Sequence, residues 1–139
     1  MREKFTLGKE ERLKSRKQIE NLFDKGKSFV VAPFRIYFVV NSELPIQKGE
    51  SRLKFGTGVS AKNFKKAVDR NRIKRLTREA WRLQKNEMAK KAKEAQRQLN
   101  VFFIYTGKEL PDFKTVKDKV AIALKKLADK IDENISSHP

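Results

Sequence analysis

The chain has 139 residues, in which 34 Lys and Arg outnumber 17 Asp and Glu for a formal net charge of +17. This length predicts a single domain spanning residues 1–139, with flexible ends at 1–12 and 134–139. The excess of cations favours a nucleic-acid partner first and an anionic membrane surface second. No cysteine is present, which excludes disulfides and thiolate metal sites and fits a cytoplasmic protein.

Membrane-spanning and targeting segments are not expected. No apolar run reaches the roughly 18 residues that a transmembrane helix requires. The N-terminus is charged and lacks the apolar stretch of a secretory signal. Hydrophobic residues make up 38% of the chain, so we expect it to fold rather than remain disordered.

The first predicted element is a helix over residues 16–25. Ser15 and Gln18 have the spacing of a capping box, and Gly26 is a natural stop. Three apolar side chains at i, i+3 and i+4 share one face, and their simplest interpretation is core: Ile19, Leu22 and Phe23.

Residues 27–40 contain the first predicted strand, clearest over 34–40. Alternation puts Phe34, Ile36, Phe38 and Val40 on an apolar core face. The other face carries Arg35, Tyr37 and Val39. It is either an ordinary half-exposed face or a surface where an aromatic ring stacks a base and a cation meets a phosphate. A polar loop over 41–52 and a second strand over 53–59 follow.

An amphipathic helix is predicted to begin near Ala67. At about 100° per residue, Ile73, Leu76, Ala80 and Leu83 share a buried face. Like charges at i, i+4 on the opposite face repel each other, and an RNA or other polyanion would relieve that repulsion. The alternative is a solvated basic face. The polar face consists of Asn71, Lys74, Arg75, Arg78, Arg82 and Lys85.

The remaining elements alternate between helix and strand. The helix either continues to Leu99 or breaks near 84–86. Residues 101–106 form a continuous apolar run, which is typical of a central strand. Apolar positions at spacings of three and four then predict a last helix over 113–133 that packs on the sheet.

The chain lacks a recognisable catalytic set. Its one histidine, His138, stands next to the C-terminal residue. No nucleophile–base pair, phosphate-binding loop or two-metal carboxylate cluster is apparent. If the protein belongs to an enzyme, another component performs the chemistry.

The run from Arg70 to Arg75, reading Arg-Asn-Arg-Ile-Lys-Arg, lies downstream of Val59-Ser60 and Lys62 and is followed by Arg78. This pattern resembles the signature of the bacterial ribonuclease P protein subunit. The resemblance implies a small α+β domain in the order αβββαβα, shared with a ribosomal protein domain. It also implies a four-stranded mixed sheet and a left-handed βαβ crossover, an exception to the usual hand. The third strand would be 55–59, and the preceding one would lie around 35–41 or within 46–54.

The family's activity is removal of the 5′ leader from precursor tRNA. By resemblance, the partners are a catalytic RNA subunit and precursor tRNA, with neither DNA nor a membrane. The RNA would perform Mg²⁺-assisted hydrolysis, and the chain itself would hold no catalytic or metal-binding residue. Residues matched to the catalytic-RNA contact are Lys66, Arg70, Asn71, Arg72, Lys74, Arg75, Arg78 and Arg82. A leader cleft between the first helix and the sheet would use Ile19, Phe23, Phe34, Arg35, Tyr37 and Lys62. Ile19 stands where family members often have phenylalanine.

Two alternatives remain at this stage. One is a structural RNA-binding protein, such as a ribosomal component. The other is a peripheral membrane protein bound through the basic helix, which is less favoured because the helix needs its apolar face for the core.

Overall fold

The computed structural model describes residues 11–13, 15–41 and 52–136, and for residues 41 and 133–136 it describes the backbone alone. Most of the predicted loop over 41–52 lies outside the described residues. The elements follow the predicted order, with one helix divided in two. They are α1 (Arg16–Lys25), β1 (Lys27–Val31), β2 (Phe34–Asn41), β3 (Leu53–Val59), α2 (Ala67–Gln84), α3 (Asn86–Ala95), β4 (Gln98–Tyr105) and α4 (Phe113–Ser136).

The four strands form a mixed sheet in the order β1-β2-β4-β3. β2 pairs antiparallel with both β1 and β4, whereas β3 runs parallel to β4. The connection between these parallel neighbours is made by α2 and α3. The predicted α+β class and mixed sheet are confirmed, and the left-handed crossover stays a prediction.

The residue pattern indicated a single strand within 27–40, where the structure has two, whereas the three strands before the basic helix that the resemblance implied are confirmed. Residues 32 and 33 form a tight turn between β1 and β2, and Val31 pairs with Phe34 directly across it. Apolar side chains continue on both sides of this turn, so the hydrophobic pattern does not break there. Pro33, which cannot donate a ladder hydrogen bond, is the local signal for the turn.

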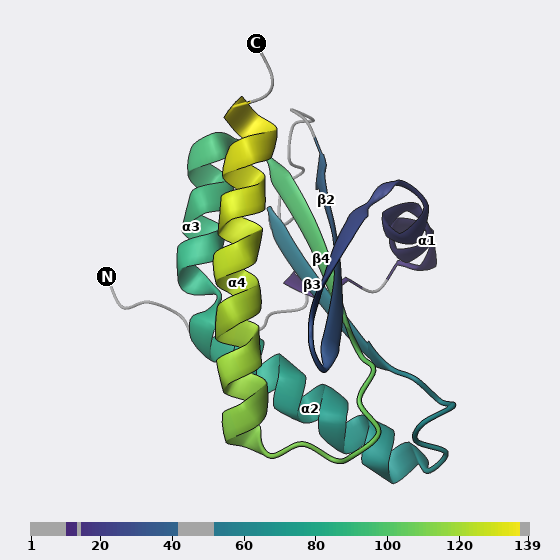
Figure 1. Ribbon diagram of the computed structural model, residues 1–139. Coiled ribbons are helices and arrows are strands. Elements are labelled where there is room, and N and C mark those ends of the chain that lie inside the picture. Colours follow the sequence, from purple (N-terminus) through teal and green to yellow (C-terminus); the bar gives the residue numbers. More distant parts are fainter. Residues whose placement is uncertain (1–10, 14, 42–51, 137–139) are drawn as a thin grey trace.

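The sheet has helices on both faces (Figure 1). α3 and α4 lie on one side, α2 runs below them, and α1 lies on the other side of the sheet. The core lies under α2 and α4, where Phe55 stacks on Trp81 with ring centroids 4.4 Å apart and an interplanar angle of 11°. The strands and α4 complete this core with Ile36, Phe38, Val101, Phe103, Val116, Val120 and Leu127, all buried.

The buried face of α2 differs from the predicted one in part. Ile73 and Ala80 are fully buried as expected, but Leu83 is 36% exposed. Trp81 and Thr77 occupy the core instead. Thr77 can be buried because its hydroxyl donates to the carbonyl of Ile73 at 2.8 Å, which satisfies its hydrogen-bonding requirement within the helix.

α2 and α3 meet at Lys85, so of the two alternatives, a continuous helix and a break near 84–86, the structure shows the break. Lys85 was expected on the polar face of α2, and this was wrong. The residue is 3% exposed, and its Nζ lies 2.6 Å from Oε2 of Glu11. Residues 11–13 are therefore held near this junction, with Leu13 buried and its amide donating to the Phe55 carbonyl at 2.8 Å.

Candidate nucleic-acid interface

The side of α2 opposite the core carries exposed cations. Arg72, Arg75 and Arg78 are exposed together with Asn71, and Lys74 is half-buried at the margin. Within the described residues, the three arginines make no ion pair. We call Asn71, Arg72, Lys74, Arg75 and Arg78 the cationic face. Guanidinium groups held on a rigid helix and left open can bind successive phosphates of a nucleic acid.

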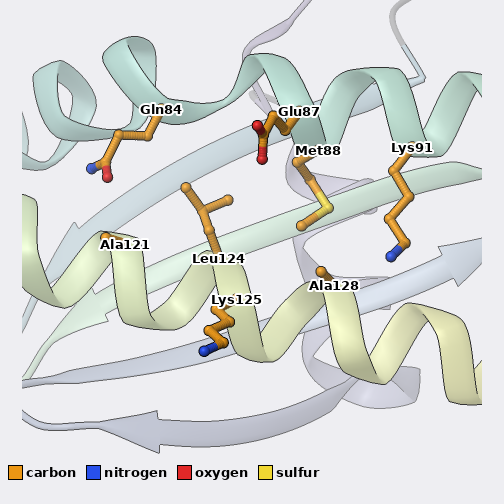
Figure 2. Close-up of a pocket in the computed structure, with 8 residues that line it drawn as sticks. All are labelled: Gln84, Glu87, Met88, Lys91, Ala121, Leu124, Lys125 and Ala128. Atoms are coloured by element: carbon orange, nitrogen blue, oxygen red, sulfur yellow. The ribbon is translucent and has the colours of Figure 1, made fainter.

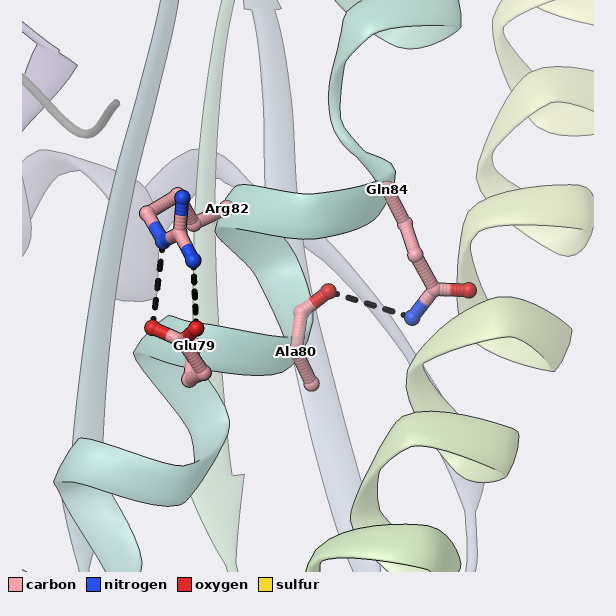
Figure 3. Close-up of polar contacts among 4 residues, drawn as sticks. All are labelled: Glu79, Ala80, Arg82 and Gln84. Carbon is pink, nitrogen blue, oxygen red and sulfur yellow. Dashed lines mark hydrogen bonds and ion pairs between the residues drawn. The ribbon is translucent and has the colours of Figure 1, made fainter. Parts of the chain in front are cut away.

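Arg82 belongs to the same side of the helix but already has an anionic partner. Its Nε donates to Oε2 of Glu79 at 3.1 Å, and its Nη2 contacts the other carboxylate oxygen, as Figure 3 shows. The hydrogen bonds from Arg82 lower the pKa of Glu79, and the same bonds raise the pKa of Arg82. Arg82 is therefore less available to RNA than Arg72, Arg75 and Arg78, which have no ion pair within the described residues, although all four were predicted to contact the RNA.

Arg70 binds the protein's own backbone. Its Nη1 donates to the carbonyl of Phe64 at 2.7 Å and to that of Lys65 at 2.8 Å. These two hydrogen bonds hold the turn that leads into α2, so Arg70 stabilises the fold in addition to any contact with RNA. Lys66 at the N-cap of α2 is exposed and makes no capping bond with its side chain.

A second surface lies where α1 packs on β2 and β4. The face of the sheet toward α1 presents side chains in register: Tyr37 opposite Phe102, and Arg35 opposite Ile104. Phe23 of α1 makes edge-on contacts with Tyr37 and Phe102, with centroid distances of 4.8 and 5.4 Å. We call Phe23, Tyr37 and Phe102 the aromatic strip. Single-stranded nucleic acids commonly stack bases on such rings while cations meet the backbone.

The predicted leader residues are divided between the two faces of the sheet. Phe23 is 41% exposed, Arg35 is exposed, and Tyr37 and Ile19 are half-buried on the α1 side. Phe34 is 1% exposed and packs edge-on against Phe103 and Tyr105 in the core. The structure therefore disagrees with the predicted leader contact by Phe34, because the ring of this residue is buried and RNA cannot reach it. Alternation along β2 had already put Phe34 on the core face.

Phe102 was not among the predicted site residues. The run over 101–106 concealed it, because residues 101–105 are all aliphatic or aromatic and show no alternation between polar and apolar positions. The usable signal was strand pairing: once β4 lies beside β2, Phe102 shares a face with Tyr37.

Lys62 lies on the connection between the two surfaces. It is exposed in the turn after β3, and Asn63 next to it donates to the carbonyl of Thr106 at 3.2 Å. Gly58, near the end of β3, lies in register with Ile104, which itself lies opposite Arg35. The segment after β3, which contains Lys62, therefore connects the sheet face that carries Arg35 with the start of α2.

A groove of about 410 Å³ between α3 and α4 is a separate feature (Figure 2). Met88 and Leu124 supply apolar walls, and charged side chains stand at the margin. Nearby, Lys91 Nζ lies 2.7 Å from Oδ2 of Asp132 and ties the two helices together. This groove is formed where α3 packs on α4, and it lies on the opposite side of the sheet from α1 (Figure 1).

Two surveys of the described residues bear on the class of function. No group of three or more His, Cys, Asp or Glu side chains is placed to hold a metal ion in that part of the chain. Among the helices of the described ranges, none has the length and apolar character needed to cross a membrane.

Comparison with known proteins decides the family. A family model described as Ribonuclease P matches residues 7–128. The chain belongs to the ribonuclease P protein family. It is 38% identical over 124 residues to the ribonuclease P protein component of Porphyromonas gingivalis, covering 89% of this chain and 88% of that one. The corresponding protein of Shouchella clausii is 41% identical over 75 residues, covering 54% and 56% of the two chains.

Solved ribonuclease P proteins have the same fold. The protein from Thermotoga maritima matches with a TM-score of 0.61 and 29% identity, covering 84% of this chain and 96% of that one. The Staphylococcus aureus protein matches with a TM-score of 0.64 at 22% identity, over 84% and 94% of the two chains, which supports the fold alone.

Family membership confirms the resemblance and the predicted class of function. The chain is a protein component of an RNA-containing endoribonuclease that processes tRNA, and it is not favoured as a ribosomal structural protein. An RNA partner in a ribonucleoprotein follows from the family. The individual RNA-contacting residues stay predictions.

Proposed function

We propose that this chain binds the catalytic RNA of ribonuclease P through the cationic face of α2 and the 5′ leader of precursor tRNA through the surface between α1 and the sheet. The observation that carries the proposal is the cationic face itself. Arg72, Arg75 and Arg78 stay exposed and without ion pairs within the described residues, on a helix whose other side is fixed in the core.

The core explains why α2 can act as a rigid platform. Ile73 and Trp81 are buried at 0% and 1% exposure, and Trp81 stacks on Phe55 of β3. Movement of the helix would disrupt this packing, so the guanidinium groups keep a fixed spacing along the helix axis. Fixed donors favour a structured RNA, whose phosphates are also held in place.

The leader would be bound by side chains that suit an unpaired strand. Phe23 offers an exposed ring, and Tyr37 packs edge-on against it. Arg35, two residues before Tyr37 on the same face of β2, is also exposed. Stacking tolerates any base, and the cations meet phosphates whatever the sequence. We therefore expect leader binding to depend more on the presence of a single strand than on its sequence.

In this proposal the RNA subunit performs the cleavage. Mg²⁺, held mainly by the RNA and the substrate, would supply the metal-assisted chemistry of the hydrolysis. No group of three or more His, Cys, Asp or Glu side chains is placed to hold a metal ion among the described residues, and the proposal leaves the metal to the two RNAs. The chain's own contribution would be positioning: its cations lower the repulsion between the two RNAs, so that phosphates of the RNA subunit and the substrate can come together and share Mg²⁺.

Precursor and mature tRNA distinguish this function from a structural one. The holoenzyme, reconstituted from this chain and a matching catalytic RNA, should bind precursor tRNA more tightly than mature tRNA. RNA alone should show less of this difference. Equal binding of the two tRNAs by the holoenzyme would contradict leader recognition and point to a structural RNA-binding role.

Cleavage at limiting Mg²⁺ tests the division of labour. Adding this chain should restore cleavage by the RNA at a Mg²⁺ concentration where the RNA alone is slow. The chain without RNA should cleave nothing. Cleavage by the protein alone would overturn the assignment of chemistry to the RNA.

A further inference from the structure

Phe102 occupies a space that two glycines leave open on the neighbouring strand. A Cβ atom added at Gly56 would lie 2.7 Å from Cδ2 of Phe102, and one at Gly58 would lie 3.2 Å from its Cε1. Both distances are shorter than ordinary carbon–carbon contact. The ring of Phe102 therefore lies across β3 at the only positions of that strand that lack side chains.

The ring of Phe102 is also in contact with the exposed ring of the aromatic strip. Phe23 meets Phe102 at an interplanar angle of 77° and Tyr37 at 84°, both edge-on arrangements. Phe23 is 41% exposed, whereas Phe102 and Tyr37 are half-buried. Two supporting rings, one from each of two adjacent strands, thus restrict the orientation of one exposed ring on α1.

We infer that Phe102 is a positioning residue that holds the Phe23 ring in the orientation that stacks an unpaired base of the precursor-tRNA leader. The inference rests on the proposed function and deepens it. A phenylalanine ring on a helix surface has rotamer freedom that stacking would have to remove. Edge-on contacts already made in the free protein remove part of that freedom before RNA arrives. Ile19, one turn before Phe23 on α1, supplies no ring for this purpose.

Phe102→Leu tests the inference in the reconstituted holoenzyme. The change keeps an apolar side chain but removes the edge-on contact, so affinity for precursor tRNA should fall roughly 2- to 12-fold. Affinity for mature tRNA and for the catalytic RNA should not change. Phe102→Tyr keeps the ring and should restore most of the leader-dependent affinity.

The matched control is Phe29→Leu. Phe29 is also a half-buried phenylalanine with an edge-on contact, to Phe38 at 5.9 Å, but it lies on the core side of the sheet. The Phe29→Leu variant should keep the wild-type difference in affinity between precursor and mature tRNA. An equal loss in Phe29→Leu and Phe102→Leu would mean that general loosening of the sheet is responsible, and would overturn the inference.

A double-mutant cycle separates positioning from direct contact. If Phe102 acts through Phe23, then Phe102→Leu should cause no further loss once Phe23→Leu is present. A leader carrying 2-aminopurine at successive positions should lose its stacking signal at the same nucleotide in both single variants. Additive losses, or signals lost at different nucleotides, would contradict the inference.

Gly58→Ala keeps the test decisive should Phe102→Leu fail to fold. Its added methyl group requires the Phe102 ring to shift by a few tenths of an ångström. A selective loss of leader-dependent affinity supports the inference, and wild-type affinity in a folded Gly58→Ala contradicts it.

Equal binding of precursor and mature tRNA by the unmodified holoenzyme contradicts the proposed function, and this inference with it. A normal preference that Phe102→Leu does not alter contradicts this inference alone.

Discussion

Arg70 and Arg75 are five residues apart on the same basic helix, but the structure gives them different tasks. Arg70 donates to the carbonyls of Phe64 and Lys65, whereas Arg75 is exposed and has no ion pair within the described residues. Sequence alone marks both as cations of one motif. Only the folded turn before α2 shows that one of them is used by the protein itself.

Arg70→Ala should therefore lower the free energy of unfolding by about 1–2 kcal/mol, because two backbone carbonyls lose a charged donor. Arg75→Ala should change it by less than about 0.5 kcal/mol, as for other exposed positions. Urea denaturation of the free protein measures both. Equal stability of the two variants would contradict the structural task of Arg70.

The Glu79–Arg82 pair places a carboxylate beside the cationic face. Glu79→Gln removes that negative charge and leaves one acceptor oxygen in place of the two that Arg82 contacts. RNA affinity should rise, and the slope of log K against log salt should steepen by up to about 0.9, the value for one more phosphate contact. Glu94→Gln on α3, also exposed, is the control and should have no such effect. Unchanged RNA affinity in Glu79→Gln would contradict the view that Glu79 keeps Arg82 from binding RNA.

The same pair gives a pH dependence with a definite sign. The pKa of Glu79 is lowered in the folded protein by the hydrogen bonds from Arg82. Its contribution to stability is present above the ordinary carboxyl pKa and is lost as the pH falls through the lowered value. The small stability difference between wild type and Glu79→Gln should therefore disappear in acid. A difference that grows on acidification would contradict this assignment.

The candidate site was partly predictable at the scale of residues. The exposure of Arg75 and Arg78 follows from helical periodicity, which sets them opposite Ile73, whereas Arg72 was named only through the family resemblance.

The burial of Phe34 also follows from alternation along β2, and only the resemblance suggested a leader contact for it. The partial exposure of Phe102 could not be predicted, because which face of the sheet is open depends on where α1 packs. Lys85 was out of reach for a similar reason: its partner, Glu11, is distant in sequence, and no local pattern brings them together.

At the scale of elements, local signals gave the bounds of several segments. α1 begins after Ser15, whose hydroxyl accepts from the Gln18 amide at 3.3 Å, and ends before Gly26, as the capping residues predict. β3 was predicted with its observed bounds, Leu53–Val59. The division of β1 from β2 was missed because a two-residue turn interrupts an otherwise apolar stretch.

The junction between α2 and α3 depends on a contact between distant segments. Glu11→Ala should cost roughly 2–4 kcal/mol of unfolding free energy, because it removes the carboxylate partner of an ammonium that is almost fully buried. Lys85→Met should cost less, since an apolar chain of similar length can occupy the site. Glu20→Ala, which breaks the exposed pair with Arg16, should cost under about 1 kcal/mol. Similar small losses in Glu11→Ala and Glu20→Ala would contradict this account.

At the scale of the whole molecule, charge and architecture have separate roles. The net charge of +17 attracts any polyanion and says nothing of where it binds. In the proposed function, the α+β fold supplies the specificity: it packs α2 against the core through Trp81 and places α1 on the other side of the sheet (Figure 1). One small domain would thus present two different RNA-binding surfaces.

The salt dependence of catalytic-RNA binding tests the central claim most directly. It should be measured for wild type, for a triple variant of the cationic face (Arg72→Ala, Arg75→Ala and Arg78→Ala) and for a control of equal charge on α4 (Lys114→Ala, Lys117→Ala and Lys126→Ala). The cationic-face variant should bind weakly, with a slope of log K against log salt shallower by about 2–3, whereas the α4 control should keep a slope near that of wild type. Parallel slopes for wild type and the cationic-face variant, or an equal reduction in the control, would contradict the claim that this face of α2 holds the RNA.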